Sequence, residues 1–544
     1  MEILTPQMIW KGYDPAALAL NVSILSDKTD NGRRYITARF NGSTTTDGVA
    51  RVYVRCVLIA DAVSPAVVYV PDVHKAVGEV DVTKILEAGY NAIVPDYAGE
   101  RDDDPNYTIY PRSMSYANFV SDRLTEVPED MRFNCWITWA ETIMRTVTFA
   151  SGLEEVDETR IAVIGDGVSS SAVIKTAAVD QRVRCAVSMF ASGQKPSDTE
   201  GQDYLRYKVS FAEEAYAPMV KIPLLTVLSS NEQDGSTDSM STAFELMPQL
   251  SGSRLTISER VSHTIGLKQR GNIGLWLSSY LKGDGSVPAS PELTVRSDEH
   301  RLRFDIKVPA ELDDIDLFTS QGGSGGALRN WRRAKVEKTG DGEYTSTVDV
   351  YYSRRPLSAF VNATRSDGEG FSFSSPIITK VPAMLGVSET PIRTNRLVYD
   401  SDMGLDDWSV LSPLVGLDTL SMIEGPFGIR GVSSKLGTLS TFKIGDAVYH
   451  GTGSQLLQIM IYSAADQDVT FTLTACGNEK GDDKTKYTEY RFAPRLSPSD
   501  NWKKLTLQVT DFKSQLGILT DWERVVNLRI DSDAPVGIAS VLWV

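Results

Sequence analysis

The stretch GDGVS at 165–169 combines small residues and a hydroxyl in a pattern that could carry covalent chemistry. It follows a short apolar run at 160–165 and precedes a helix-like segment at 169–180. A serine nucleophile is often presented on such a strand-to-helix turn, written G-x-S-x-G, because the small neighbours allow the turn and expose the hydroxyl. In this chain Gly167 occupies the serine position, and Ser169 takes the place of the final small residue.

Two interpretations of this turn remain open. In the first, the nucleophile has been lost, and Gly167 is present only because glycine can adopt the backbone conformation that a sharp turn requires. In the second, the turn is shifted by two residues and Ser169 is the nucleophile. The run Ser169-Ser170-Ser171 is also typical of the first turn of a helix, where one hydroxyl caps backbone N–H groups.

Other reactive side chains give weaker patterns. The four cysteines are far apart and contain no CxxC pair, which indicates buried free thiols in a reducing compartment: Cys56, Cys135, Cys185 and Cys476. The acidic run at 102–104 is typical of a solvated loop rather than a cation site. The sequence therefore predicts no metal and no cofactor.

Composition narrows the possible partners. The chain has 544 residues, a formal net charge of −16 and a pI near 4.9. Nucleic-acid binding requires clustered Lys and Arg, so this balance argues against a nucleic-acid partner, whereas a neutral ligand such as a sugar fits it. The sequence contains no run of about eighteen apolar residues, so it predicts no membrane-spanning helix. The N-terminus lacks the pattern of a signal peptide, which predicts a cytoplasmic protein; a signal segment preceding it would make the protein secreted.

The elements that must position the turn alternate between strand and helix from about 50 to 285. Five short apolar runs are typical of parallel strands buried on both faces: 65–70, 92–97, 160–165, 184–190 and 222–228. Segments with helical spacing and glycine stops lie between them. This alternation predicts a doubly wound, mostly parallel sheet, preceded by antiparallel strands in the first 60 residues.

The pattern changes after a Gly/Pro/Ser-rich linker at 281–291. From there the apolar residues alternate with period two and turn residues separate the runs, which predicts all-β modules. We place the domains at 1–288, 289–388 and 389–544. The last of these has no helical stretch of useful length and predicts a jelly-roll-like sandwich.

Residues 65–285 resemble the acetylxylan-esterase and dienelactone-hydrolase-like branch of the α/β-hydrolases. The resemblance rests on "EAGYNAIVPDYAGE", "YTIYPRSMSYANF", "VDETRIAVIG", "AVDQRVRCAVSMFA", "EAYAPMVKIPLLTVLSSNEQD" and "RLTISERVSHTIG". It implies a multidomain protein with an α/β-hydrolase domain and two C-terminal all-β sandwiches. It also implies a carbohydrate or an acylated carbohydrate as the partner.

The resemblance assigns the site residues. In such proteins an Asp-x-Arg-Val segment follows the nucleophile at a set distance, and counting back from 180–183 places the nucleophile at Gly167. The acid position falls on Glu232, with Asp234 as the alternative, and the base falls on His263. The order nucleophile, acid, base is that of α/β-hydrolases.

The oxyanion side departs from the family pattern. The family usually has a His-Gly turn after the strand at 65–70, and this chain has Pro71, Asp72 and Val73 there. Proline has no N–H to donate, and a carboxylate would repel the negative intermediate. The remaining donor of the oxyanion region is Val168, which follows the nucleophile position.

The C-terminal modules resemble an immunoglobulin-like sandwich and a carbohydrate-binding jelly roll. We predict Trp331, Tyr351 and Tyr352 to be core residues of the first module, with a domain contact as the alternative. In the second module the aromatic residues of interest are Trp408, Trp502, Trp522 and Trp543. Most tryptophans in such strands are buried, and Trp408 and Trp502 are the candidates for stacking on a sugar.

Together these residues predict a non-catalytic relative of carbohydrate esterases that acts in polysaccharide or glycan binding. Two alternatives stay open. One is an active serine esterase that uses Ser169, Glu232 and His263. The other is an interaction protein that binds sugar through its C-terminal module.

Overall fold

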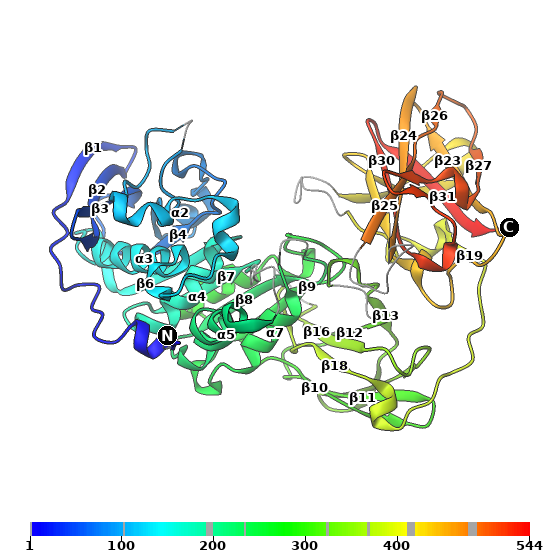
Figure 1. Cartoon of the computed structure of the whole chain (residues 1–544), viewed down its shortest axis with the longest axis horizontal. Coiled ribbons are helices and arrows are strands. Elements are labelled where there is room, and N and C mark those ends of the chain that lie inside the picture. The colour runs from blue at the N-terminus through cyan, green and yellow to red at the C-terminus, as the bar shows by residue number, and fades with distance from the viewer. Residues whose placement is uncertain are drawn as a thin grey trace.

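A computed structural model describes residues 3–101, 104–191, 200–232, 235–322, 326–366, 370–410, 419–476 and 487–544. Figure 1 shows a mixed α/β domain at the N-terminal end, a first β-sandwich below the middle of the view, and a second β-sandwich at the C-terminal end. The predicted fold class is thereby confirmed: an α/β-hydrolase domain followed by two all-β sandwiches.

A nine-stranded sheet forms the first domain, in the order β1-β2-β3-β5-β4-β6-β7-β8-β9. Strands β4 to β9 run parallel, and β1 to β3 are antiparallel as the sequence predicts. From β2 onward this is the strand order of the α/β-hydrolase fold. The strands are β1 (Ser23–Asp30), β2 (Arg33–Thr45), β3 (Gly48–Ile59), β4 (Ser64–Val70), β5 (Asn91–Pro95), β6 (Val156–Asp166), β7 (Cys185–Met189), β8 (Leu224–Ser229) and β9 (Arg254–Ser258).

Helices lie on both faces of this sheet (Figure 1). The central strands are therefore buried on both sides. The helix α3 begins after Asn134, whose side chain accepts from the Trp136 N–H, and ends at Gly152. The helices are α1 (Pro6–Ile9), α2 (Thr83–Glu87), α3 (Cys135–Ser151), α4 (Ser169–Val179), α5 (Gly201–Ser210), α6 (Glu213–Tyr216), α7 (Thr237–Glu245), α8 (Asn272–Leu277) and a π-helical turn (Ser278–Lys282).

The first β-sandwich has two sheets, β10-β11-β15-β14 and β13-β12-β16-β17, with β18 paired to β16. Their inner faces enclose a separate apolar core. The strands are β10 (Glu292–Asp298), β11 (Arg301–Lys307), β12 (Asp314–Gln321), β13 (Arg332–Ala334), β14 (Glu337–Gly340), β15 (Glu343–Asp349), β16 (Leu357–Thr364), β17 (Ser372–Ser374) and β18 (Ile378–Lys380).

This sandwich packs against the last strand of the hydrolase sheet. The Thr256 hydroxyl donates to the Ser372 carbonyl at 2.9 Å, and the Ile257 N–H donates to the Ser374 hydroxyl at 2.7 Å. Trp331 is fully buried as predicted and belongs to the core of the first domain rather than to the sandwich alone. The two domains are therefore joined through a buried, hydrogen-bonded interface.

The second β-sandwich also has two sheets, around a third large core. One sheet is β20-β21-β31-β23-β27 with β19 on β31, and the other is β22-β30-β24-β25-β28-β29 with β26 on β24. The strands are β19 (Leu397–Asp400), β20 (Leu420–Glu424), β21 (Arg430–Ser434), β22 (Thr438–Thr441), β23 (Leu457–Ser463), β24 (Gln467–Cys476), β25 (Tyr487–Phe492), β26 (Arg495–Leu496), β27 (Lys503–Leu507), β28 (Lys513–Ser514), β29 (Gly517–Ile518), β30 (Val525–Ser532) and β31 (Val536–Trp543).

Short connections without strands join the three parts of the chain. The π-helical turn ends at Lys282 and β10 begins at Glu292, whereas β18 ends at Lys380 and β19 begins at Leu397. Among the described residues, no helix has the length and apolar character needed to cross a membrane.

Candidate active site

The turn between β6 and α4 places a glycine where a hydrolase presents its nucleophile. Gly167 has φ +59°, in the left-handed region that a side chain rarely adopts. A Cβ built at Gly167 would collide with Oδ2 of Asp72 and lie 3.0 Å from its Cγ. The space for a serine side chain is therefore filled by the carboxylate of Asp72.

This carboxylate also occupies the oxyanion position. Its Oδ2 accepts the Val168 N–H at 2.9 Å, and its Oδ1 accepts the His74 N–H at 3.0 Å. In the α/β-hydrolase fold the N–H of the residue after the nucleophile stabilises the negative charge of the tetrahedral intermediate. Here that N–H is already bonded to a negative charge supplied by the protein itself.

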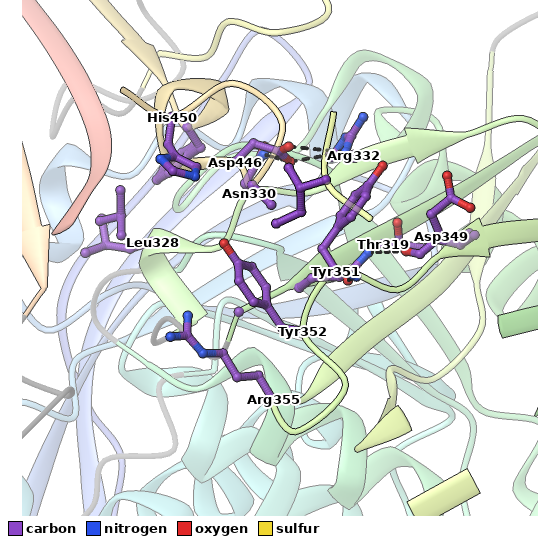
Figure 2. Close-up of a pocket in the computed structure, with 18 of the residues that line it drawn as sticks. Thr319, Leu328, Asn330, Arg332, Asp349, Tyr351, Tyr352, Arg355, Asp446 and His450 are labelled. Atoms are coloured by element: carbon purple, nitrogen blue, oxygen red, sulfur yellow. Dashed lines mark hydrogen bonds and ion pairs between the residues drawn. The ribbon is translucent and has the colours of Figure 1, made fainter. Parts of the chain in front are cut away.

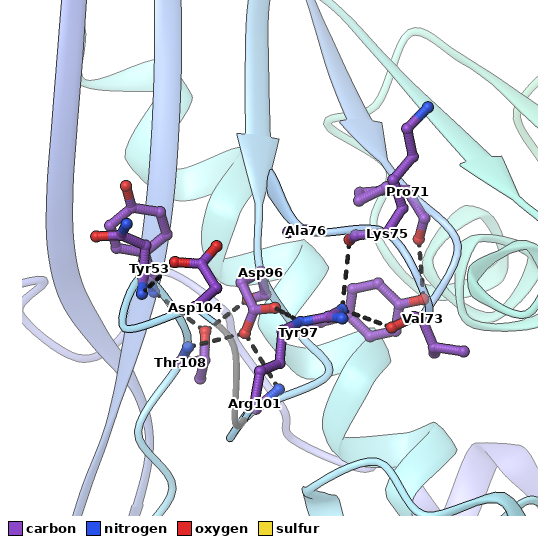
Figure 3. A network of polar contacts seen from close by, with 12 residues as sticks. Tyr53, Pro71, Val73, Lys75, Ala76, Asp96, Tyr97, Arg101, Asp104 and Thr108 are labelled. Atoms are coloured by element: carbon purple, nitrogen blue, oxygen red, sulfur yellow. Dashed lines mark hydrogen bonds and ion pairs between the residues drawn. The ribbon is translucent and has the colours of Figure 1, made fainter. Parts of the chain in front are cut away.

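Hydrogen bonds from Tyr97 and Arg101 fix the loop after β4 in this position (Figure 3). The Tyr97 hydroxyl donates to the Pro71 carbonyl at 2.9 Å. The guanidinium of Arg101 donates to the carbonyls of Val73 and Lys75, the latter at 3.3 Å. These bonds on both sides of Asp72 set its direction toward the β6–α4 turn.

A buried carboxyl group positions Arg101 in turn. Asp96 lies at the end of β5, 3.9 Å from the Arg101 guanidinium, and its Oδ2 accepts the N–H groups of Gly99 at 3.1 Å and Thr108 at 2.8 Å. Burial raises the pKa of Asp96 to about 6, although these hydrogen bonds and Arg101 act to lower it. Sequence reasoning missed this support, because nothing in a single sequence marks Tyr97, Asp96 and Arg101 as partners of the oxyanion loop.

The predicted acid and base lie side by side. His263 Nδ1 is 3.4 Å from Glu232 Oε1, which is long for a hydrogen bond. Glu232 is buried, whereas the His263 side chain is 37% exposed. The His263 ring packs on Phe190 with 4.6 Å between ring centroids, and both residues have positive φ, +49° and +58°. The structure thus brings the predicted acid and base together, with His263 and its neighbour Phe190 in backbone conformations that non-glycine residues rarely adopt.

Several carboxylates act on the pKa of His263. Burial acts to lower the pKa of His263, but Glu232, Asp166 and Asp72 outweigh it and raise that pKa above its ordinary value. Asp166 is itself buried, which raises its pKa, and it accepts the Tyr69 hydroxyl at 3.0 Å. A carboxylate that raises the pKa of a neighbouring histidine also makes the ring a stronger base, so these charges are compatible with the roles predicted for the pair.

Ser169 points into the backbone rather than toward the acid–base pair. Its side chain is fully buried. Its Oγ lies 2.7 Å from the Val70 carbonyl and 3.0 Å from the Asp166 carbonyl, and it accepts the Asp166 N–H at 2.9 Å. These contacts use the hydroxyl for local structure. They argue against the alternative in which Ser169 is the nucleophile.

The rest of the serine run is also enclosed. Ser170 donates to the backbone carbonyls of Gly165 and Met189, and Ser171 contacts Glu213. The first turn of α4 has no side-chain cap, so the predicted capping role of these hydroxyls is wrong. Their hydrogen bonds instead tie α4 to the sheet and to α6.

The acid loop depends on the first β-sandwich. The Asn231 amide donates to the carbonyls of Ala327 at 3.1 Å and Arg329 at 2.9 Å, and the Trp331 indole donates to the Ser230 carbonyl at 3.2 Å. The position of Glu232 is therefore set by a module outside the hydrolase domain.

Several predicted residues are remote from this site or lie outside the described residues. The alternative acid, Asp234, and the first two residues of the run 102–104 are outside them. Within the described ranges no cluster of three or more His, Cys, Asp or Glu side chains could hold a metal ion. The described cysteines form no disulfide, and three are buried.

The two tryptophans predicted to meet a sugar are mostly covered. Trp408 is 3% exposed and packs edge-on against Tyr399 at 5.3 Å, so its faces are not available to a ligand. Trp502 is half-buried, its indole donates to the Pro426 carbonyl at 3.2 Å, and its ring lies where a Cβ of Gly425 or Gly431 would be. Both tryptophans therefore contribute to packing.

The fold is that of an α/β-hydrolase, with Gly167 at the β6–α4 turn and the predicted acid and base 3.4 Å from each other. No family model matches the chain, and no curated protein matches it. Among solved structures, it is similar to acetyl xylan esterase 1 from Thermoanaerobacterium sp. JW/SL YS485, with 15% identity and a TM-score of 0.40 over 49% of this chain and 90% of that one.

Two further solved structures are similar over the same half. Acetyl xylan esterase from Paenibacillus sp. R4 has 16% identity and a TM-score of 0.39, covering 49% of this chain and 91% of that one. Glucuronoyl esterase from Solibacter usitatus has 18% identity and a TM-score of 0.37, covering 52% of this chain and 91% of that one.

Proposed function

We propose that this protein is a non-hydrolytic member of the α/β-hydrolase fold that binds carbohydrate. The observation that carries the first part is the carboxylate of Asp72, which fills the side-chain space above Gly167 and accepts the Val168 N–H at 2.9 Å. One side chain thus excludes a nucleophile and blocks the oxyanion donor.

Two features act in the same direction. An ester hydrolase of this fold needs a nucleophilic hydroxyl and a donor for the oxyanion. Gly167 supplies no hydroxyl, and the Val168 N–H is already bonded to Asp72. Acyl transfer at this elbow therefore lacks both its nucleophile and its oxyanion donor.

The second part, carbohydrate binding, rests on the architecture and charge of the chain. Two β-sandwich modules accompany the hydrolase domain, and the net charge of −16 disfavours nucleic acid. A hydroxyl-rich ligand suits polar cavities lined by aromatic and charged side chains. A glycan array probed with the full chain tests this part, and binding to no glycan would refute it.

Hydrolysis is tested on the purified full chain with p-nitrophenyl acetate and acetylated xylan. We expect the same rate for the native protein and for His263→Ala, because neither assembles a nucleophile and a base. Labelling with a fluorophosphonate probe, followed by peptide mass spectrometry, examines the elbow directly. Turnover that His263→Ala abolishes, or a label on Ser169, would establish the active-esterase alternative.

A further inference from the structure

A cavity of about 680 Å³ lies between the two β-sandwiches, remote from the elbow. Its volume falls in the range of small-molecule sites, roughly 300–1,000 Å³. Strands β12, β13 and β15 and the turn at 351–355 form one wall, and segments at 442–450 and 523–526 of the second sandwich form the other. Figure 2 shows side chains from both modules converging on this space.

A polar clamp joins the two walls. The Asp446 carboxylate of the second sandwich accepts the Asn330 amide at 3.1 Å and the Arg332 guanidinium at 3.3 Å, both from the first sandwich. The Asp446 side chain is 9% exposed, so little solvent competes with this contact. The clamp holds the walls of the cavity at a defined separation.

Arg355 differs from the other cations that line the cavity. Arg332 is paired with Asp446, and Arg333 is paired with Asp316. Lys335 is paired with Glu337, and the Arg524 guanidinium donates to the Cys476 carbonyl. The guanidinium of Arg355 lies 4.6 Å from the centre of the Tyr352 ring and forms no ion pair within the described part of the chain. Stacking on Tyr352 orients the guanidinium and leaves its planar fork available for a carboxylate.

Further polar groups line the same cavity. His450 Nδ1 is 3.1 Å from the Gly451 carbonyl, a contact in which the Nδ1–H donates and Nε2 is left for a ligand. Asp349 adds a carboxylate to the same lining. Tyr351 and Tyr352, expected in the core, are instead partly exposed and line the cavity with their rings and hydroxyls.

We propose that this cavity binds an oligosaccharide that contains uronic acid, an inference that rests on the proposed carbohydrate-binding function. A uronate offers a planar carboxylate for the fork of Arg355 and many hydroxyls for His450, Asp349 and the tyrosines. A neutral sugar would leave the guanidinium without a charged partner.

The test is calorimetric titration of the full chain with trimers of galacturonate, mannuronate and glucuronate. The matched ligand control is the methyl ester of each trimer, which keeps the ring and removes the charge. We expect at least one uronate trimer to bind about tenfold more tightly than its ester, and the difference to shrink at high salt.

The matched protein variants are Arg355→Ala and Arg354→Ala. These residues are neighbours of the same type, and only Arg355 lines the cavity. We expect Arg355→Ala to weaken uronate binding about tenfold and Arg354→Ala to leave it within about twofold. Both side chains are exposed, so both variants should keep the native melting temperature.

Three results would overturn the inference: no binding of any uronate trimer, equal binding of a trimer and its ester, or equal affinity of the two variants. Failure here is distinguishable from failure of the proposed function. If only neutral glycans bind, the preference for uronate is refuted and carbohydrate binding is supported. If the protein hydrolyses esters, the non-hydrolytic function is refuted and the proposal of a uronate site in the cavity is unaffected.

Discussion

Replacing Gly167 by serine should not produce an esterase unless Asp72 is replaced as well. The new Cβ would collide with Asp72 Oδ2, and the Val168 N–H would remain bonded to that carboxylate at 2.9 Å. In the double variant Gly167→Ser/Asp72→Gly the hydroxyl gains space and the Val168 N–H becomes available to an oxyanion. The acid–base pair of Glu232 and His263 is already in place, 3.4 Å apart.

The expected gain follows from the value of one oxyanion donor. Removal of a single donor lowers kcat by about 10²–10³ in serine hydrolases. The double variant should therefore hydrolyse p-nitrophenyl acetate at least about 100-fold faster than Gly167→Ser alone. The gain should vanish in the triple variant that adds His263→Ala, since the base is then missing.

The pH profile gives a second measurement. Asp72 is one of the carboxylates that raise the pKa of His263, so its removal lowers that pKa. A base acts when deprotonated, and the acid limb of the activity should therefore lie at lower pH in Gly167→Ser/Asp72→Gly than in Gly167→Ser. If Gly167→Ser alone matches the double variant in rate, Asp72 does not block the site and the reasoning fails. A folded double variant with no gain over the single variant would refute it equally.

Three further predictions concern stability. Lys175 is fully buried beside Glu213, and burial lowers the pKa of Lys175. Glu213→Gln should lower the free energy of unfolding, measured in urea, by about 3 kcal/mol, because it leaves a buried charge without its partner. The double variant Lys175→Met/Glu213→Gln should be near neutral, and an equal loss in both variants would contradict this prediction. Burial raises the pKa of Glu141 to about 7. The native state therefore binds more protons than the unfolded chain, and stability should fall as pH rises from about 4.5 to 7, by about 2 kcal/mol, but not in Glu141→Gln. Phe427 is 81% exposed at φ +61°, so Phe427→Gly should raise the melting temperature through about 1 kcal/mol of relieved strain, and a lower melting temperature would show that its ring packs.

The sequence predicts the parts of this fold that depend on periodicity and turn chemistry. The buried runs at 65–70, 160–165 and 222–228 correspond to β4, the apolar end of β6 and β8. Short, apolar, β-branched segments between helices leave few alternatives to a parallel sheet. The change to period two after 291 likewise predicts the two sandwiches.

Side-chain direction could not be predicted in the same way. Tyr351 and Tyr352 were expected in the core, with a domain contact as the alternative, and they line a cavity where the two sandwiches meet. Trp408 was a candidate for stacking on a sugar, although most tryptophans in such strands are buried, and it is buried. Whether an aromatic residue in a β-module is covered depends on the neighbouring domain, because the cavity exists only where the two sandwiches meet. That arrangement leaves no local pattern in the sequence.

The elbow shows how the two kinds of information combine. Sequence alone indicates two separate departures, a glycine at 167 and an aspartate at 72, and gives no reason for them to occur together. The structure makes them one feature, because the carboxylate at 72 fits only where residue 167 has no Cβ. In turn, a glycine at 167 leaves the Val168 N–H facing a space that the carboxylate fills and satisfies. Tyr97 and Arg101 hold the loop through hydrogen bonds to the Pro71 and Val73 carbonyls. A serine at 167 would therefore still meet the Asp72 carboxylate, and removal of that carboxylate would still leave residue 167 without a hydroxyl. If the proposed non-hydrolytic function is correct, catalysis at this elbow therefore requires simultaneous change at both positions, because each of the two residues maintains the arrangement of the other.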